Sequence, residues 1–283
     1  MIARRRILPR LTQVLAVTLL GLSTLAAVAV LVFIVVVIMR KGLPVISLQF
    51  LFSPSRDMGR QGGILQPLVG TLALPALALL VALPLGVGTA IYLTEYTRES
   101  RLTRAIRFGT DCLAAVPSII FGLFGFIFFV ILLKWGWSLL SGGLTLAIMV
   151  LPTIIRTSEE AIRAVPRSYR EVSVSLGGTR IQTTFRAVLP SALPGIVTGV
   201  MLSVGRAVGE TAAVIYTAGS ALSLPTSLFA PVRTLAVHFY ILAREGLSEA
   251  NAYGTAAVLV ILVLLINLVT YWLMNRLIAR RSR

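Results

Sequence analysis

The sequence predicts an all-α membrane protein with six spans. Of its 283 residues, 57% are hydrophobic and 13% are charged, and the mean hydropathy is +0.92. Soluble domains usually contain about 25% charged residues. Stretches of the length that crosses a hydrocarbon core lie at about 13–38, 67–93, 113–133, 137–155, 191–218 and 255–274. The polar segments between them are too short to bury a core, so any soluble domain must belong to another polypeptide.

The residue counts exclude several kinds of chemistry. Cys112 is the only cysteine and His238 the only histidine, so no disulfide framework and no Cys/His cluster for zinc or haem can be assembled. A GxxxxGK[ST] nucleotide loop is absent, because neither Lys41 nor Lys134 follows a glycine. A Ser/His/Asp constellation is absent as well. We therefore expect no catalytic residue, no metal site and no ATPase site on this chain.

The net charge of +16 is explained by membrane topology. Six spans place both ends of the chain on one side. With that side assigned to the cytoplasm, 18 of the 26 basic residues lie inside and 7 outside, and Arg206 lies within a span. This asymmetry fits the positive-inside rule, and the inner arginines also suit anionic membrane lipids. Nucleic acid is therefore not expected as a partner.

The first three predicted spans differ in their length and in their proline and glycine residues. The first is too long for a secretory signal core and is expected to be a retained anchor, followed by an irregular outer loop over 40–66. The second carries Pro75 and Pro84, which lipid tolerates only where neighbouring groups satisfy the freed carbonyls, so we expect it inside the bundle. In the third, Gly122 and Gly125 have a spacing that allows close helix approach.

The connection over 156–189 is predicted to be a helix-turn-helix segment outside the membrane. Thr157 and Glu160 have capping-box spacing, and Pro166 interrupts the turn that would follow. A helix over 167–176 then stops at Gly177-Gly178, and a third, over 180–188, follows the Thr179 cap and ends by Pro190. We interpret the segment as a docking element; the alternative is an ordinary solvated loop. Its glutamates, Glu159, Glu160 and Glu171, are expected to be caps and surface charges.

The fifth span contains an arginine and a glutamate four residues apart, Arg206 and Glu210. At about 1.5 Å per residue, Arg206 lies near or past the bilayer midplane, where an unpaired charge costs at least about 2.5 kcal/mol. Helical spacing makes Glu210 its expected partner on the same face. Two interpretations remain open: a structural ion pair, or a pathway site for an anionic substrate. Gly205 and Gly209 leave space beside the charges, which favours the pathway.

The connection resembles the EAA loop of ATP-binding-cassette importer permeases. Glu171, Gly177, Leu189 and Pro190 match that pattern, whereas Val172, Ser173 and Ala187 depart from it. In that family the loop is the coupling helix that docks into the ATPase. The resemblance therefore implies a six-helix type I importer transmembrane domain, with ATPase-coupling residues at Arg170, Glu171, Gly177, Leu189 and Pro190.

Three further stretches are similar to the PstA-type permease of bacterial phosphate importers: Val116 to Gly125, Met149 to Ala161, and Gly205 to Ala212. The R-T-S-E-E-A run favours this type over the paralogous PstC type. The resemblance implies that Arg206 and Glu210 serve phosphate passage, with Ser118 and Thr211 as further pathway candidates. An arginine fork suits phosphate oxygens. Because Arg206 is the only arginine within a span, a dianion is expected to need a second one from the partner subunit.

The resemblance also implies an assembly in the bacterial cytoplasmic membrane with both termini in the cytoplasm. Its partners would be a PstC-type permease, an ATPase dimer that binds ATP and Mg, and an extracytoplasmic phosphate-binding protein. No cofactor is expected on this chain. The predicted parts are an anchor and outer loop over 1–66, the permease domain over 67–275 and a cytoplasmic tail over 276–283. The alternatives are transport of another oxyanion such as sulfate or molybdate, a PstC-type subunit, an ungated anion channel, and an intramembrane lipid-phosphate enzyme.

Overall fold

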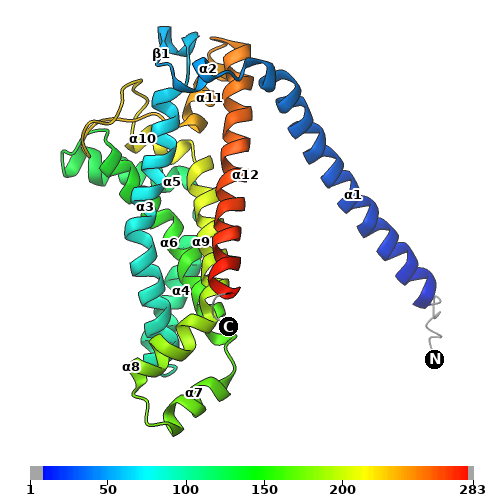
Figure 1. The fold of residues 1–283 in the computed structure, drawn as a ribbon, viewed down its shortest axis with the longest axis vertical. Helices are drawn as coiled ribbons and strands as arrows, with labels where there is room; N and C mark the ends of the chain where they lie inside the picture. Colours follow the sequence, from blue (N-terminus) through cyan, green and yellow to red (C-terminus); the bar gives the residue numbers. More distant parts are fainter. Residues whose placement is uncertain (1–8, 280–283) are drawn as a thin grey trace, which may run out of the picture.

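The computed structural model describes residues 9–279, and these residues are almost entirely helical (Figure 1). The helices are α1 Pro9–Gly42, α2 Leu48–Phe52, α3 Leu65–Ile91, α4 Arg101–Ala115, α5 Ser118–Gly125, α6 Leu139–Arg163, α7 Arg167–Ser175, α8 Arg180–Thr183, α9 Leu189–Gly209, α10 Ala212–Thr217, α11 Leu235–Arg244 and α12 Glu249–Ala279. Strands β1 Ser55–Arg56 and β2 Gln61–Gly62 form a small antiparallel hairpin. π-helical segments follow α3, α5 and α8, at Tyr92–Tyr96, Phe126–Leu132 and Thr184–Val188.

The described helices confirm a multi-spanning membrane protein. Five are long and apolar enough to cross a membrane, and the bent pair Arg101–Ala115 and Ser118–Leu132 makes a sixth if it is counted as one span. The chain bends by 101° between the two halves of that pair. The helix breaks between the two halves because Val116 and Pro117 are extended. The predicted third span, 113–133, therefore covers the last residues of the amphipathic α4 together with the apolar second half of the pair.

The core of the bundle is the contact between α3 and α6, with α9 packed against both. Small residues set this close spacing: a Cβ at Gly86 would lie 2.6 Å from Ile154, and one at Gly199 would lie 1.8 Å from Thr157 Oγ1. Without such residues the helices would have to move apart. The prediction that the second span, α3, lies inside the bundle is confirmed.

The short helix α5 packs against α6 and α10 through its glycines. A Cβ at Gly122 would lie 2.8 Å from Ala213 Cα, and one at Gly125 would lie 2.1 Å from Thr145 Oγ1. Both positions are buried. The predicted role of this glycine pair in close helix approach is therefore confirmed.

The helix α6 corrects the prediction of a new helical turn starting at Thr157. It runs without a break to Arg163, and Thr157 Oγ1 donates instead to the carbonyl of Thr153, one turn earlier, at 2.8 Å. A capping box works only where a helix begins, because the N–H groups of a helix interior already have partners. Burial of Ile154, Ile155 and Ile162 against the bundle favours a helix that continues through the Thr157–Glu160 motif.

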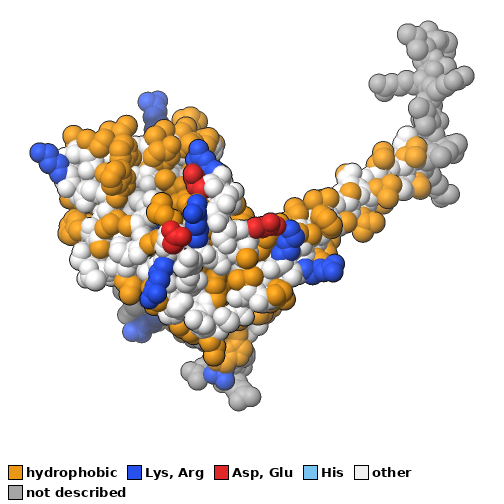
Figure 2. All heavy atoms as spheres, turned by 90° about the horizontal axis from the view of Figure 1, so that it is seen from above, with side chains coloured by type: hydrophobic (Ala, Val, Ile, Leu, Met, Phe, Trp, Pro, Cys, Tyr) orange, Lys and Arg blue, Asp and Glu red, His pale blue; other side chains and the backbone are white. Residues whose placement is uncertain are grey.

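The two ends of the bundle differ (Figure 1). One end, which we call the β1 end, carries the hairpin, α2, α10 and α11; the other, the α7 end, carries α7 and α8. Figure 2, which looks onto the β1 end, shows more Lys and Arg than Asp and Glu side chains. The helix α1 leaves the bundle from the β1 end, and its apolar window is 0% buried within the chain. Of the predicted terminal basic residues, Arg4 to Arg6 and Arg280 to Arg283 lie outside the described residues.

Candidate functional site

The fifth span breaks at its charged residues. The helix α9 ends at Gly209, Glu210 is extended (φ −72°, ψ 130°), and α10 begins at Ala212. Glu210 Oε1 accepts a hydrogen bond from the backbone N–H of Ala213 at 3.1 Å. The predicted pairing of Arg206 with Glu210 on one helical face is therefore wrong. An N–H at the start of a helix lacks a partner within the helix, and the Glu210 carboxylate supplies one.

Arg206 lies one turn before this break and is half-buried. Among residues 9–279 it has no ion pair, and no hydrogen bond of its side chain is formed within the described chain. A Cβ at Gly205 or Gly209 would meet no atom within 4 Å. These glycines therefore do not serve packing within this chain. The space they leave lies beside an unpartnered guanidinium.

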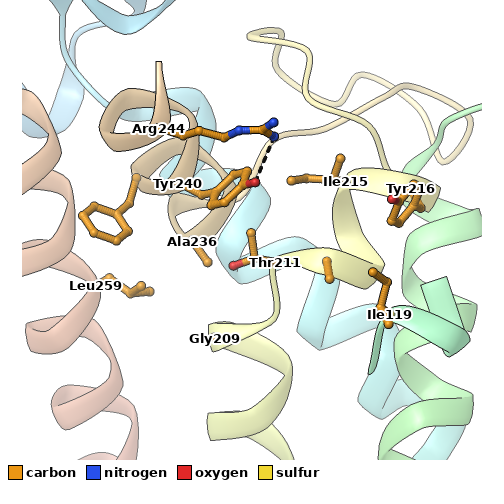
Figure 3. Close-up of a pocket in the computed structure, with 11 residues that line it drawn as sticks. Ile119, Gly209, Thr211, Ile215, Tyr216, Ala236, Tyr240, Arg244 and Leu259 are labelled. Atoms are coloured by element: carbon orange, nitrogen blue, oxygen red, sulfur yellow. Dashed lines mark hydrogen bonds between the residues drawn. The ribbon is translucent and has the colours of Figure 1, made fainter. Parts of the chain in front are cut away.

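A cavity of about 530 Å³ opens at the break (Figure 3). Gly209 and Thr211 contribute to its lining, as does Ile119, the residue after Ser118. On the opposite wall, Arg244 Nη1 donates to Tyr240 Oη at 2.9 Å (Figure 3). The structure thus brings Thr211 to this cavity and places Ser118 at the start of the neighbouring α5. Arg244 on α11 is a cationic group that the sequence pattern did not single out.

At the α7 end the connection has the predicted form. The helix α7 covers Arg167–Ser175, Gly177 has φ +79°, and Thr179 and Gln182 form a complete capping box. The predicted stop at Pro190 is wrong, because one helical stretch runs from Arg180 to Gly209. The π segment before Pro190 explains this: Leu189 N–H donates to the carbonyl of Thr184, five residues earlier, and the wider turn accommodates a proline.

This connection exposes several large apolar side chains. Large exposed side chains lie on α7, on α8 and in the following π segment: Tyr169, Val172, Val174, Leu176, Ile181 and Phe185. A cavity of about 430 Å³ between α7 and the π segment is lined in part by Tyr169, Val172 and Leu176. Exposed charges, among them Arg167, Glu171, Arg180 and Arg186, lie on the same connection. Several large apolar side chains exposed together at one bundle end favour a protein docking surface over a solvated loop.

One of the predicted coupling residues, Arg170, holds α7 to the bundle. Its guanidinium donates to both carboxylate oxygens of Glu95, with Nη2 to Oε1 at 2.6 Å, and also to the carbonyls of Ile162 and Val165. Glu171 and Gly177 are exposed, and Leu189 and Pro190 are half-buried at the start of α9. Sequence reasoning missed Glu95, since nothing local marks it as the partner of a residue 75 positions away.

A second ionic cluster ties α4 to α6. Glu159 Oε1 accepts from Arg107 Nε at 2.8 Å and pairs with Arg163 Nη2 at 2.6 Å, and Arg107 also pairs with Glu99. The side chain of Glu159 is only 4% exposed. The prediction that Glu159 is a cap or surface charge is therefore wrong. Its place at the contact between α4 and α6 buries it, and two arginines compensate its charge.

Comparison with known proteins places this architecture in a family. Residues 82–283 match the model of the binding-protein-dependent transport system inner membrane component. The chain is similar to the probable ABC transporter permease protein YqgI of Bacillus subtilis, with 36% identity over 93% of this chain and 95% of that one. It is also similar to the phosphate transport system permease protein PstA of Pasteurella multocida, with 32% identity over 92% and 93% of the two chains.

The fold is shared with a chain of the MetNI methionine ABC transporter solved in inward-facing conformations. The TM-score is 0.60 at 23% identity, over 76% of this chain and 94% of that one. The similarity to PstA-type permeases and the type I importer fold, both predicted from the sequence, are confirmed. The chain belongs to the binding-protein-dependent inner membrane component family, the permeases of ABC transporters, and is a transport subunit of a multi-pass inner-membrane complex.

Proposed function

We propose that the chain forms half of the translocation pathway of an ATP-driven importer of inorganic phosphate. The assignment of phosphate as the substrate rests on the similarity to a PstA phosphate permease over more than nine-tenths of both chains. The site is consistent with an anion, because Arg206 stands at a helix break with no carboxylate paired to it in residues 9–279. A guanidinium fork binds phosphate oxygens through charge-assisted hydrogen bonds.

The uncovered face of α9 supports a pathway shared with a second permease. Thr198, Leu202 and Gly209 are exposed on it, at intervals of about one and two turns, and Arg206 lies beside them. A membrane-embedded face that carries an arginine cannot face lipid without cost. A paralogous permease of the PstC type would cover this face and close the pathway. An extracytoplasmic phosphate-binding protein would deliver the substrate.

Coupling to a separate ATPase would act through one rigid element. The apolar docking surface of α7 and α8 leads into the helical stretch from Arg180 to Gly209. Along that stretch Arg206 follows Arg180 by about 39 Å of helix length, at about 1.5 Å per residue. A movement of the ATPase against α7 and α8 would therefore shift the helix that carries Arg206. ATP and Mg would bind to the ATPase.

The orientation follows from the same assignment. The α7 end would face the cytoplasm, with both termini on that side, and the β1 end would face outward. Four of the inner arginines pair with nearby carboxylates: Arg107, Arg156, Arg163 and Arg170. They therefore serve the structure as well as the topology.

Uptake by the reconstituted complex tests the substrate. Proteoliposomes containing both permeases and the ATPase are given phosphate-loaded binding protein, and uptake of radiolabelled inorganic phosphate is measured with and without ATP. We expect ATP-dependent uptake that unlabelled phosphate competes and that equal concentrations of sulfate and molybdate leave unchanged. Competition by sulfate or molybdate without competition by phosphate would refute the assignment. Uptake that does not need ATP would instead indicate a channel.

A further inference from the structure

A buried arginine at the β1 end has no counter-charge. Arg233 lies in the segment between α10 and α11, and 4% of its surface is exposed. The ion pairs of residues 9–279 all involve other side chains. Burial lowers the pKa of the Arg233 guanidinium. A buried cation in this state is costly unless something else pairs with it.

The hydrogen bonds of Arg233 leave one end of the guanidinium free. Nε donates to the carbonyl of Ser220 at 2.7 Å, and Nη1 donates to Nδ1 of His238 at 3.3 Å. Nη2 has no partner among the described residues. Nη2 is also not fully enclosed. In residues 9–279, the fully enclosed side-chain nitrogen and oxygen atoms without a hydrogen-bond partner are Ser158 Oγ and Glu159 Oε2, and Nη2 is not among them. Nη2 therefore keeps some accessible surface, and Arg233 is one of the residues that line a neighbouring cavity.

This neighbouring cavity has a volume of about 770 Å³. Its lining includes Trp137, Tyr216, Ser220 and Ala221, and Arg233 is the one charged residue among the lining residues. The absence of carboxylates from this lining leaves a positive potential in the cavity. The walls are mostly apolar, so the charge is less screened than it would be in bulk water.

The cavity adjoins the one at the helix break. Ile215 and Tyr216 of α10 line both, so the two cavities lie on either side of this short helix. The cavity at the helix break is lined by Thr211 and Gly209, and Arg206 lies one turn before Gly209 on α9. Arg233, at the β1 end, and Arg206, within the span, thus stand at the two ends of this row of cavities.

We propose that Arg233 and its cavity form an outer oxyanion site, which receives the substrate before it passes α10 toward Arg206. The inference rests on the proposed function for the identity of the anion, a tetrahedral oxyanion such as phosphate. Ser220 and His238 hold two corners of the guanidinium in place and leave Nη2 for the ligand. A fixed, planar fork loses little freedom when it binds an oxyanion. A purely structural Arg233 would only anchor the segment between α10 and α11.

Trp137 gives a readout that does not depend on transport. The complete complex is prepared in nanodiscs with 5-fluorotryptophan, and the resonance of Trp137 is identified by its loss in Trp137→Phe. Inorganic phosphate is then titrated without ATP or binding protein. We expect a saturable shift of this resonance, retained in Arg206→Ala. Arg233→Gln should raise the half-saturating phosphate concentration at least about tenfold, because a charge-assisted hydrogen bond is lost.

Two further variants separate binding from folding. Ala221→Phe fills part of the cavity without adding a fluorinated residue, and should abolish the shift even if Arg233→Gln fails to assemble. Arg60→Gln removes an exposed positive charge at the same end and should leave the titration unchanged. The proposal is overturned if the wild type shows no saturable shift, or if an assembled Arg233→Gln or Ala221→Phe complex titrates like wild type. Failure of the phosphate uptake assay alone would instead overturn the proposed function.

Discussion

The contact between Arg170 and Glu95 predicts how firmly the docking surface is held. Three N–H to carboxylate hydrogen bonds join the two side chains, at 2.6, 3.1 and 3.2 Å, and the side chains are 26% and 10% exposed. Breaking a buried pair costs about 3–5 kcal/mol, and a pair with some access to water costs less, so we expect about 2 kcal/mol for Glu95→Gln. That value corresponds to roughly 30-fold faster amide exchange in α7, when exchange occurs through local detachment of α7 from the helical bundle.

Hydrogen exchange measured by mass spectrometry on the complex without its ATPase checks this value. Arg170→Gln should accelerate the same peptides, and the double variant should add little, because both changes remove one interaction. Glu245→Gln, an exposed carboxylate at the other end, serves as the control. Less than about twofold acceleration of the 167–175 peptides in Glu95→Gln, or fully additive effects in the double variant, would refute the reasoning.

Three further predictions concern stability. Burial and the charge of Arg233 lower the pKa of His238 from 6.5 to about 4. Between these pH values only the unfolded state takes up the proton, so thermal unfolding of the complex should show up to roughly 3 kcal/mol of stability lost as the pH falls from about 6.5 to 4. His238→Gln should flatten this pH dependence of stability, and an unchanged pH dependence in that variant would contradict the prediction. Gly177→Ala should destabilise the α7–α8 connection by about 1–2 kcal/mol because its φ is +79°, seen as faster limited proteolysis there, whereas Gly109→Ala, inside α4 with open space around it, should not. Gly125→Val should cost at least about 1–3 kcal/mol through its clash with Thr145 and lower the yield of monodisperse complex; wild-type yield and melting temperature would count against the tight contact.

Features written in consecutive residues could be predicted from the sequence. The turn at Gly177 and the cap at Thr179 depend on residues within one helical turn, so α7 and the start of α8 were predicted closely. The glycines of α5 were recognised for the same reason. The apolar spans were placed correctly wherever the run of hydrophobic residues was unbroken.

Features decided by distant contacts could not be predicted. Glu159 sits beside the Thr157–Glu160 capping pair and was grouped with the caps and surface charges, but packing of α6 against α4 buries it between two arginines. The i, i+4 spacing of Arg206 and Glu210 implied a pair only if the helix continued, and the break at Gly209 depends on α10 packing against α5 and α6. Arg233 looked like one outer charge among seven until the fold enclosed it.

The central claim is that Arg206, left without a partner in this chain, binds the transported anion. Phosphate uptake by the reconstituted complex, measured together with ATP hydrolysis stimulated by the binding protein, tests it most directly. Arg206→Ala should lower uptake at least about tenfold in an intact complex, with partial recovery in Arg206→Lys, because the charge returns without the fork. Leu202→Ala, one turn away on the same exposed face, should leave uptake near wild type. Wild-type uptake by the assembled Arg206→Ala complex would contradict the claim.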